Sequence, residues 1–162
     1  MGYYQFTKEQ KLNTNIEQLW SFMSCPSNLK TITPPAMGFE ITSDELPGDI
    51  YSGMIISYKV SPLFKIKTTW VTEITQVKWQ KYFVDEQRVG PYDMWHHQHF
   101  IEEIPGGVLM RDVVSYVPPY RWIGRLANSF IIKKKLEQIF AYRKEVLEKK
   151  FGMYLEKSNE KR

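Results

Sequence analysis

Cysteine is almost absent from this sequence, because Cys25 is the single example among 162 residues. One cysteine cannot form a disulfide within the chain, and such a composition suits a reducing compartment. The first residues, MGYYQFTKEQ, lack the apolar stretch of a secretory signal peptide. The sequence also has no run of about 18 apolar residues, the length that a membrane-spanning helix needs. We therefore expect a cytoplasmic protein without a transmembrane segment.

Signals of nucleotide or nucleic-acid binding are missing as well. The glycines of GPY (90–92) and PGG (105–107) suit hairpin turns, and the sequence has no glycine-rich phosphate loop. The net charge is only +4, and lysines gather in KKK (133–135) and EKK (148–150), as on a solvated helix face. A nucleic-acid-binding protein would more often show arginines interleaved with aromatic residues on one face. We therefore expect no nucleic-acid partner.

What the sequence does have is aromatic side chains. Ten Tyr, nine Phe and five Trp make up 15% of the chain, a content that suits a β-rich sheet or a pocket walled by rings. The length of 162 residues is that of one domain that buries a core without disulfides or metal. We expect a single domain over residues 1–152 and a flexible basic tail over residues 153–162.

Hydrophobic periodicity changes twice along the chain. Residues 3–12 alternate as in a strand, and residues 13–24 and 27–32 then favour two short helices. Period-two patterns follow and predict strands over residues 38–45, 52–60, 64–74, 79–87, 94–104 and 108–117. After Pro118 and Pro119 the helical period returns. It predicts one helix from about residue 120 to residue 151, roughly 45 Å long.

This order of elements predicts the architecture. Sequential hairpins form an antiparallel sheet, and one face of these strands is apolar and must be covered. The long C-terminal helix is the only predicted element large enough to cover it, so we expect an α+β fold with the sheet curled around that helix. The apolar residues near the start of this helix are Trp122, Ile123, Leu126 and Phe130. We expect them to pack under the sheet, and an interfacial membrane or partner surface is the alternative.

Four strings carry a resemblance to a known family. They are ITPP (32–35), DEQRVGPYDMWHHQH (85–99), MRDVVSY (110–116) and IGRL (123–126). Together with the order of elements, they make nearly the whole chain resemble the SRPBCC superfamily, the START and polyketide cyclase/dehydrase-like group, and above all its small stand-alone bacterial members. The resemblance implies a helix-grip fold, in which a curved antiparallel sheet of six to seven strands wraps around a long C-terminal helix. Two short helices follow the first strand.

The resemblance also implies a cavity between the sheet and the C-terminal helix. This cavity holds a hydrophobic or amphipathic small molecule that is lipid-, polyketide- or aromatic-like. Members of the superfamily range from lipid carriers to cyclases, so the resemblance does not choose between a carrier and a catalyst. The partner that it implies is a hydrophobic small-molecule ligand.

Strand parity sorts the side chains that face this cavity, because residues two apart on a strand share a face. The sets that contain Trp, Phe, Met and Val are expected to face inward, and the same sets match the family strings. The predicted ligand-binding residues are Tyr58, Trp70, Phe83, Asp85, Gln87, Trp95, His97, His99, Met110, Asp112 and Tyr116. His96 falls on the other face and is expected to be solvated.

Asp85, Gln87, His97, His99 and Asp112 form a polar group within this apolar wall. An unpaired buried polar group costs on the order of 1–3 kcal/mol, so we expect His97 or His99 to pair with Asp85 or Asp112 across neighbouring strands. The group has three interpretations. It forms a structural network that fixes strand register, it orients the polar end of a ligand, or it binds metal, since His-x-His plus a carboxylate suits zinc or iron. The first two are compatible, and we expect no metal.

Catalysis is a further alternative, with Asp85, His97, His99 and Asp112 as candidate catalytic residues. An Asp–His pair can act as a general base, whereas no nucleophile is convincing, since Cys25 precedes a proline and has no histidine nearby in sequence. We expect binding of a hydrophobic small molecule without a cofactor. The alternatives are a cyclase- or dehydratase-type enzyme that uses the Asp–His pair, and a structural or partner-binding domain whose cavity is filled by its own aromatic side chains.

Overall fold

Seven antiparallel strands form one sheet in the order β1-β7-β6-β5-β4-β3-β2. The computed structural model describes residues 3–44, 46, 48–61, 66–118 and 131–155. The strands are β1 (Tyr4–Leu12), β2 (Glu40–Ile41), β3 (Met54–Val60), β4 (Thr68–Lys78), β5 (Tyr82–Val89), β6 (Met94–Ile104) and β7 (Gly107–Val117). The α+β class and the seven-stranded sheet are confirmed.

Short helices connect the first two strands, and one long helix follows the last. The α-helices are α1 (Ile16–Met23), α2 (Leu29–Ile32) and α4 (Lys133–Phe151), and the 3-10 helices are η1 (Pro26–Asn28) and η2 (Pro35–Met37). The side chain of Asn15 caps α1 by accepting a hydrogen bond from the Gln18 N–H at 2.8 Å. Gly152, with a φ of 92°, ends α4.

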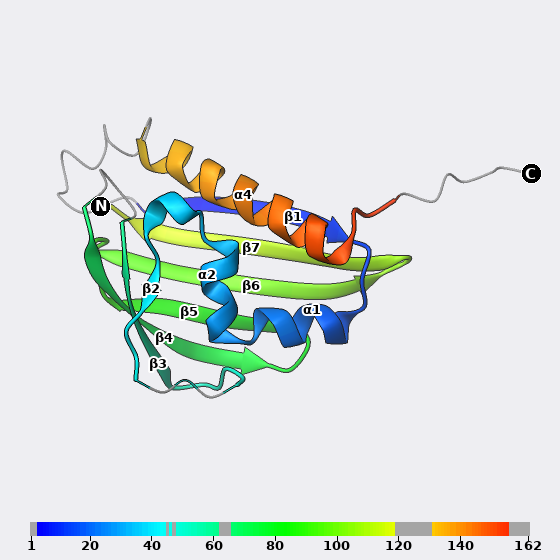
Figure 1. Ribbon diagram of the computed structural model, residues 1–162, viewed down its shortest axis with the longest axis horizontal. Coiled ribbons are helices and arrows are strands. Elements are labelled where there is room, and N and C mark those ends of the chain that lie inside the picture. Colours follow the sequence, from blue (N-terminus) through cyan, green and yellow to red (C-terminus); the bar gives the residue numbers. More distant parts are fainter. Residues whose placement is uncertain (1–2, 45, 47, 62–65, 119–130, 156–162) are drawn as a thin grey trace, which may run out of the picture.

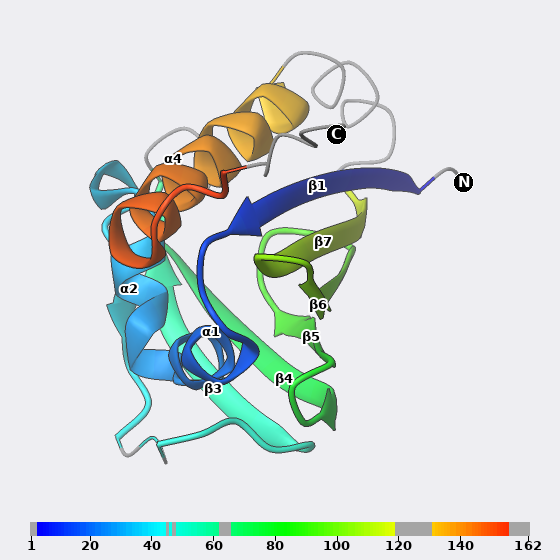
Figure 2. The same ribbon diagram turned by 90° about the vertical axis from the view of Figure 1, so that its right-hand side faces the viewer.

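Helix α4 crosses the sheet on its concave side, and α1 and α2 lie on the same side (Figures 1 and 2). Its buried residues are Leu136, Phe140, Arg143 and Leu147, which follow one another at three- and four-residue intervals along one face of the helix. Three of the four are apolar and pack into the core. Arg143 is the exception, because it lies on the same buried face of α4 although its side chain is charged.

The hairpin between β5 and β6 is held by a side chain as well as by its backbone. Gln87 Nε2 donates to the carbonyl oxygen of Tyr92 at 2.6 Å, and the Tyr92 N–H donates to Gln87 Oε1 at 3.2 Å. A Cβ atom on Gly90 would collide with this Gln87 side chain. The two hydrogen bonds of the Gln87 amide therefore fix the shape of the turn. Glycine at position 90 leaves room for this amide, which a larger side chain would displace.

The hairpin between β5 and β6 sets the register of these two strands. Phe83 lies opposite His99, and Asp85 lies opposite His97, across β5 and β6. His99 in turn lies opposite Asp112 across β6 and β7. The predicted hairpin over residues 85–100 is thus confirmed, with its parity intact.

Three strands differ from their predicted bounds by three residues or more at one end or both. The strand expected over 38–45 pairs only at Glu40–Ile41, because Ser43 Oγ accepts from the Ser57 N–H at 2.8 Å in place of a backbone partner. The strand expected over 64–74 is described from Thr68 to Lys78, with residues 62–65 outside the described part. The strand expected from residue 79 begins at Tyr82, because Gln80, with a φ of 54°, lies in the preceding turn.

The predicted long helix is described from Lys133 onward. The expectation that it starts near residue 120, and the expected packing of Trp122, Ile123, Leu126 and Phe130, lie outside the described residues. Most of the predicted tail also lies outside them. Its first residues contact the domain, since Met153 forms a β-bridge with Leu12 and the Tyr154 hydroxyl donates to the Pro105 carbonyl oxygen at 2.8 Å.

Candidate functional site

Two histidines and two aspartates meet on the inner face of β5, β6 and β7. His97 Nε2 lies 3.0 Å from Asp112 Oδ1, and His99 Nε2 lies 2.8 Å from Asp85 Oδ2. Two further contacts join the pairs, His99 Nδ1 to Asp112 Oδ1 at 2.8 Å and His97 Nδ1 to Asp85 Oδ2 at 3.5 Å. The expected Asp–His pairing is therefore present, and it forms a closed network.

Arg143 of α4, the helix that covers the sheet, completes this network. Its Nη1 lies 3.1 Å from Asp112 Oδ1, so this one oxygen contacts His97, His99 and the guanidinium together. Arg143 Nη2 lies 3.4 Å from His99 Nδ1 and 3.9 Å from the sulfur of Met23. We refer to Asp85, His97, His99, Asp112 and Arg143 as the buried charge cluster.

Both carboxyl groups of the cluster remain ionised. Burial alone would raise the pKa of Asp112, but Arg143 and the two histidines outweigh it and hold this pKa well below its usual value. Burial opposes ionisation of Asp85 as well, and His97, His99 and Arg143 together hold its pKa below the usual value. The inner face of the sheet thus carries two negative charges.

The pKa values of the two histidines are shifted in opposite directions. Burial and the neighbouring His99 lower the pKa of His97, so its imidazole stays neutral at pH 7. Burial also disfavours a charged His99, but its bonds to Asp112 and Asp85 outweigh burial and raise its pKa. Both nitrogens of His99 lie 2.8 Å from carboxylate oxygens, a geometry in which an imidazolium donates twice. With Arg143 positive and two aspartates negative, the cluster carries no net positive charge even when His99 is protonated.

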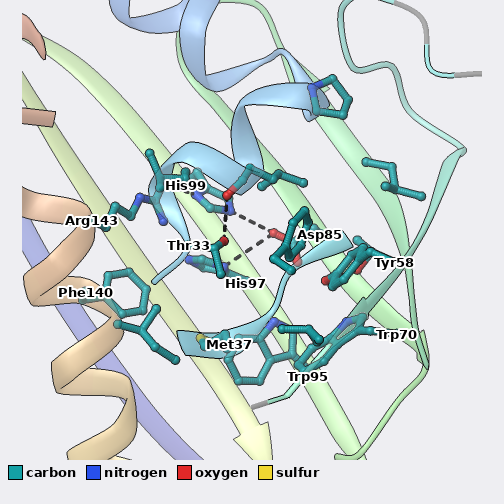
Figure 3. Close-up of a pocket in the computed structure, with 18 of the residues that line it drawn as sticks. Thr33, Met37, Tyr58, Trp70, Asp85, Trp95, His97, His99, Phe140 and Arg143 are labelled. Carbon is teal, nitrogen blue, oxygen red and sulfur yellow. Dashed lines mark hydrogen bonds and ion pairs between the residues drawn. The ribbon is translucent and has the colours of Figure 1, made fainter. Parts of the chain in front are cut away.

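An apolar cavity lies beside the cluster, between the sheet and α4, with a volume of about 190 Å³. Figure 3 shows Asp85, His97 and His99 at one side of it, and Tyr58, Trp70 and Trp95 grouped at another. Trp70 stacks on Tyr58 with ring centroids 6.1 Å apart and meets the edge of Trp95 at 5.3 Å. The walls are therefore mainly rings and aliphatic side chains, and the polar groups are concentrated in one region.

Seven of the predicted ligand-binding residues line this cavity. They are Tyr58, Trp70, Phe83, Asp85, Trp95, His97 and His99. Tyr58 also contributes a hydroxyl that lies 3.1 Å from Thr72 Oγ1, and because burial raises its pKa, this hydroxyl stays protonated. Most of the residues that strand alternation assigned to the cavity therefore line it.

Four predicted residues lie elsewhere, which corrects the proposed lining. Gln87 is used by the hairpin turn. Asp112 lies behind the histidines, and Met110 packs in the core with Leu12 and Leu147. Tyr116 is covered by rings, with the Tyr92 centroid 5.9 Å and the Trp95 centroid 6.2 Å away. These side chains face inward as expected, but other side chains separate them from the open space.

The sequence analysis missed the residues that other segments bring to the cavity. Arg143 was not singled out, because the solvated face was inferred from the lysines of the same helix, although its spacing from Phe140 and Leu147 places it on the buried face. Thr33 and Met37, from the ITPP segment and η2, close another side, and Tyr92 enters from the hairpin. The helical spacing of Arg143 was a usable signal, whereas the folding of the loops over the cavity had none.

The site offers a set of metal-ligating atoms, but its charges oppose a metal ion. One atom each of Asp85, His97 and His99 lie within 4.8 Å of one another. Arg143 already places a positive charge 3.4 Å from His99 Nδ1, and both ring nitrogens of His99 already have partners in the cluster. The residues therefore fit a proton and a guanidinium better than a divalent cation, and the absence of metal stays a prediction.

The solved structures show what this fold is similar to. A ginseng (Panax ginseng) major latex-like protein matches with a TM-score of 0.67 at 11% identity, over 92% of this chain and 97% of that one. A protein from Arthrobacter aurescens matches with a TM-score of 0.68 at 11% identity, over 98% and 93%. One from Mycobacterium smegmatis gives 0.64 at 14% identity, over 90% and 92%. At these identities the likeness shows the helix-grip fold.

No protein-family model matches the sequence, and the search of curated proteins finds no match. Within the part of the chain that the structure describes, no helix has the length and apolar character needed to cross a membrane. The order of elements in the structure and its similarity to the solved structures confirm the helix-grip fold.

Proposed function

We propose that this protein binds one hydrophobic or amphipathic small molecule in the cavity between its sheet and α4, as a ligand-binding member of the SRPBCC superfamily. The observation that carries the proposal is the cavity itself, a mainly apolar space of about 190 Å³ with the buried charge cluster on one side and rings on another. A few fixed polar groups in an apolar pocket are the usual anatomy of a small-molecule site. Well-packed interiors rarely leave open spaces of this size.

The arrangement separates two tasks. The rings of Tyr58, Trp70 and Trp95 provide apolar surface that gains free energy when it is removed from water. The charge cluster is held by its own internal bonds, so it stays in place whether or not a ligand is present. A ligand therefore meets a preformed site, which lowers the entropic cost of binding.

A neutral fluorescent probe tests the proposal. 1-Naphthylamine should bind with micromolar-range affinity, and Trp95→Ala should weaken it about tenfold, because a large ring contact with the probe is lost. The matched control is Trp79→Ala, since Trp79 is 63% exposed in the turn before β5 and lies outside the cavity. Absence of saturable binding to the wild-type protein, or equal effects of the two substitutions, would overturn the proposal.

An enzyme is the second candidate, and it rests on His97. This imidazole lines the cavity and is kept neutral by burial and by His99, so it is available as a base. The two aspartates are poorer bases, because their pKa values are held below the usual value. In a reaction of this type, His97 would take a proton from an acidic carbon of the bound molecule and return it to another atom of the same molecule.

Proton exchange distinguishes the enzyme from the carrier. A methyl ketone held in the cavity in D₂O should exchange its α-protons for deuterons if His97 acts as a base, and His97→Gln should abolish the acceleration. Glu86→Gln is the control, since Glu86 pairs with His96 outside the cavity. Exchange no faster than in buffer, together with saturable binding, favours a carrier.

A further inference from the structure

Two polar hydrogens at the cavity wall have no acceptor. Among the described residues, Trp70 Nε1, Arg143 Nε and Trp20 Nε1 are buried without a hydrogen-bond partner. Trp70 and Arg143 line the cavity, whereas Trp20 does not. A buried donor left unpaired costs on the order of 1–3 kcal/mol, so a ligand that supplies an acceptor at the cavity wall recovers part of this cost.

Trp70 is the donor that a ligand in the ring-walled region of the cavity can reach. Its indole lies among Tyr58, Tyr92 and Trp95, with ring centroids 5.3 to 6.1 Å away. Arg143 differs, because its Nη atoms already contact Asp112 and His99. Figure 3 shows Arg143 and Trp70 on different sides of the cavity, with Asp85 and His97 between them.

The charge balance selects the type of acceptor. The buried charge cluster has no net positive charge to offer, because two carboxylates surround Arg143 and His99, and the carboxylate that lines the cavity, Asp85, would repel an anion. A carboxylate ligand would lose its hydration, and the two cationic side chains among the described lining residues are Arg143, which is already paired with Asp112, and the partly exposed Lys135. A carbonyl oxygen accepts a hydrogen bond while carrying no net charge, so it suits Trp70 Nε1 without this cost.

We propose that the ligand is a neutral, ring-bearing carbonyl compound (an aryl ketone, ester or amide) whose carbonyl oxygen accepts a hydrogen bond from Trp70 Nε1. This inference rests on the proposed binding function and specifies the ligand class. The aromatic walls select a ring, and the volume of about 190 Å³ limits the molecule to about one or two fused rings.

Three naphthalenes of similar size test the inference by calorimetry: 2-ethylnaphthalene, 2-acetylnaphthalene and 2-naphthoate. The ketone should bind about tenfold more tightly than the hydrocarbon, although water solvates the ketone better. The carboxylate should bind most weakly. Trp70→Phe keeps a ring and removes the N–H, so the variant should bind the ketone and the hydrocarbon with about equal affinity.

Trp20→Phe is the matched control, because it removes an equally unpaired buried N–H away from the cavity. It should keep the tenfold preference. If Trp70→Phe does not fold, the Trp70 indole N–H resonance replaces it, and this resonance should move downfield with the ketone alone.

The outcomes separate the two proposals. If none of the three compounds binds, the proposed function fails and the inference fails with it. If the ketone and the hydrocarbon bind equally well, the binding function stands and the inference is wrong, because a neighbouring ring face then satisfies Trp70. Tightest binding by naphthoate, or a preference that survives Trp70→Phe, also overturns the inference.

Discussion

Replacing Asp85 with Asn tests the electrostatic account of the buried charge cluster, because Asn keeps the shape and removes the charge. The carboxylate lies 2.8 Å from His99 Nε2 and 3.5 Å from His97 Nδ1. Two unit charges about 4 Å apart attract each other by about 4 kcal/mol at an effective dielectric constant of about 20. Since desolvation offsets part of this attraction, we expect a loss of about 3 kcal/mol in the free energy of unfolding at pH 5.5.

The loss depends on pH with a definite sign. His99 has a raised pKa in the folded protein, so its protonation contributes stability below its unfolded-state pKa of about 6.5. This contribution fades as the pH rises through the folded-state pKa. The substitution lowers the His99 pKa, and each unit of lowering removes about 1.4 kcal/mol of the contribution. The carboxylate of Asp85 is ionised at both pH 5.5 and pH 8.5 because its pKa is lowered, so the loss should be larger at pH 5.5.

Denaturant unfolding at the two pH values measures the loss, and NMR titration measures the histidine pKa values. The control is Glu86→Gln, which breaks a histidine–carboxylate pair with the same 2.8 Å separation on the half-exposed outer face. Solvent screening should limit that loss to about 1 kcal/mol or less. An equal loss at both pH values for Asp85→Asn, with an unshifted His99 pKa, would refute the reasoning.

Three further predictions follow from the cluster and the core. Arg143→Met should cost about 3–5 kcal/mol at pH 7, and because burial without Arg143 raises the pKa of Asp112, this deficit should shrink as the pH falls through that raised pKa; chemical unfolding at several pH values measures it. Elemental analysis should find less than stoichiometric zinc or iron, and about one ion per chain that is lost in His97→Ala would contradict this. Met110→Ala should cost about 2–5 kcal/mol of stability but leave probe affinity within about twofold, because Met110 is buried outside the cavity; a Kd shift comparable with that of Trp95→Ala would place it in the lining.

The inner wall of the sheet could be predicted from the sequence because strand periodicity is strict. Once the hairpin at 90–93 sets the register, alternation alone brings Asp85, His97 and His99 to one face. Gln87 shares that parity, yet the turn uses its amide, and only the geometry of the turn reveals this demand.

The helical and loop sides of the site were harder to predict. Arg143 lies in a lysine-rich helix, where a solvated position is the usual outcome, and its burial depends on Asp112 of a distant strand. Tyr116 was placed on the correct face, but Tyr92 and Trp95 cover it, and such covering depends on how the ends of several elements pack. Local patterns therefore predict which way a side chain points, whereas the extent of the cavity depends on long-range contacts.

Binding inside the cavity is the central claim, and the tryptophan indole N–H signals test it directly. A titration with 2-acetylnaphthalene, followed by proton–nitrogen correlation NMR, should shift the signals of Trp70 and Trp95 saturably at one molecule per chain, because both side chains line the cavity. The signals of Trp20, buried in the core, and Trp79, exposed at a turn, should stay in place. Unchanged signals of Trp70 and Trp95, or shifts of similar size at all four without saturation, would contradict the account.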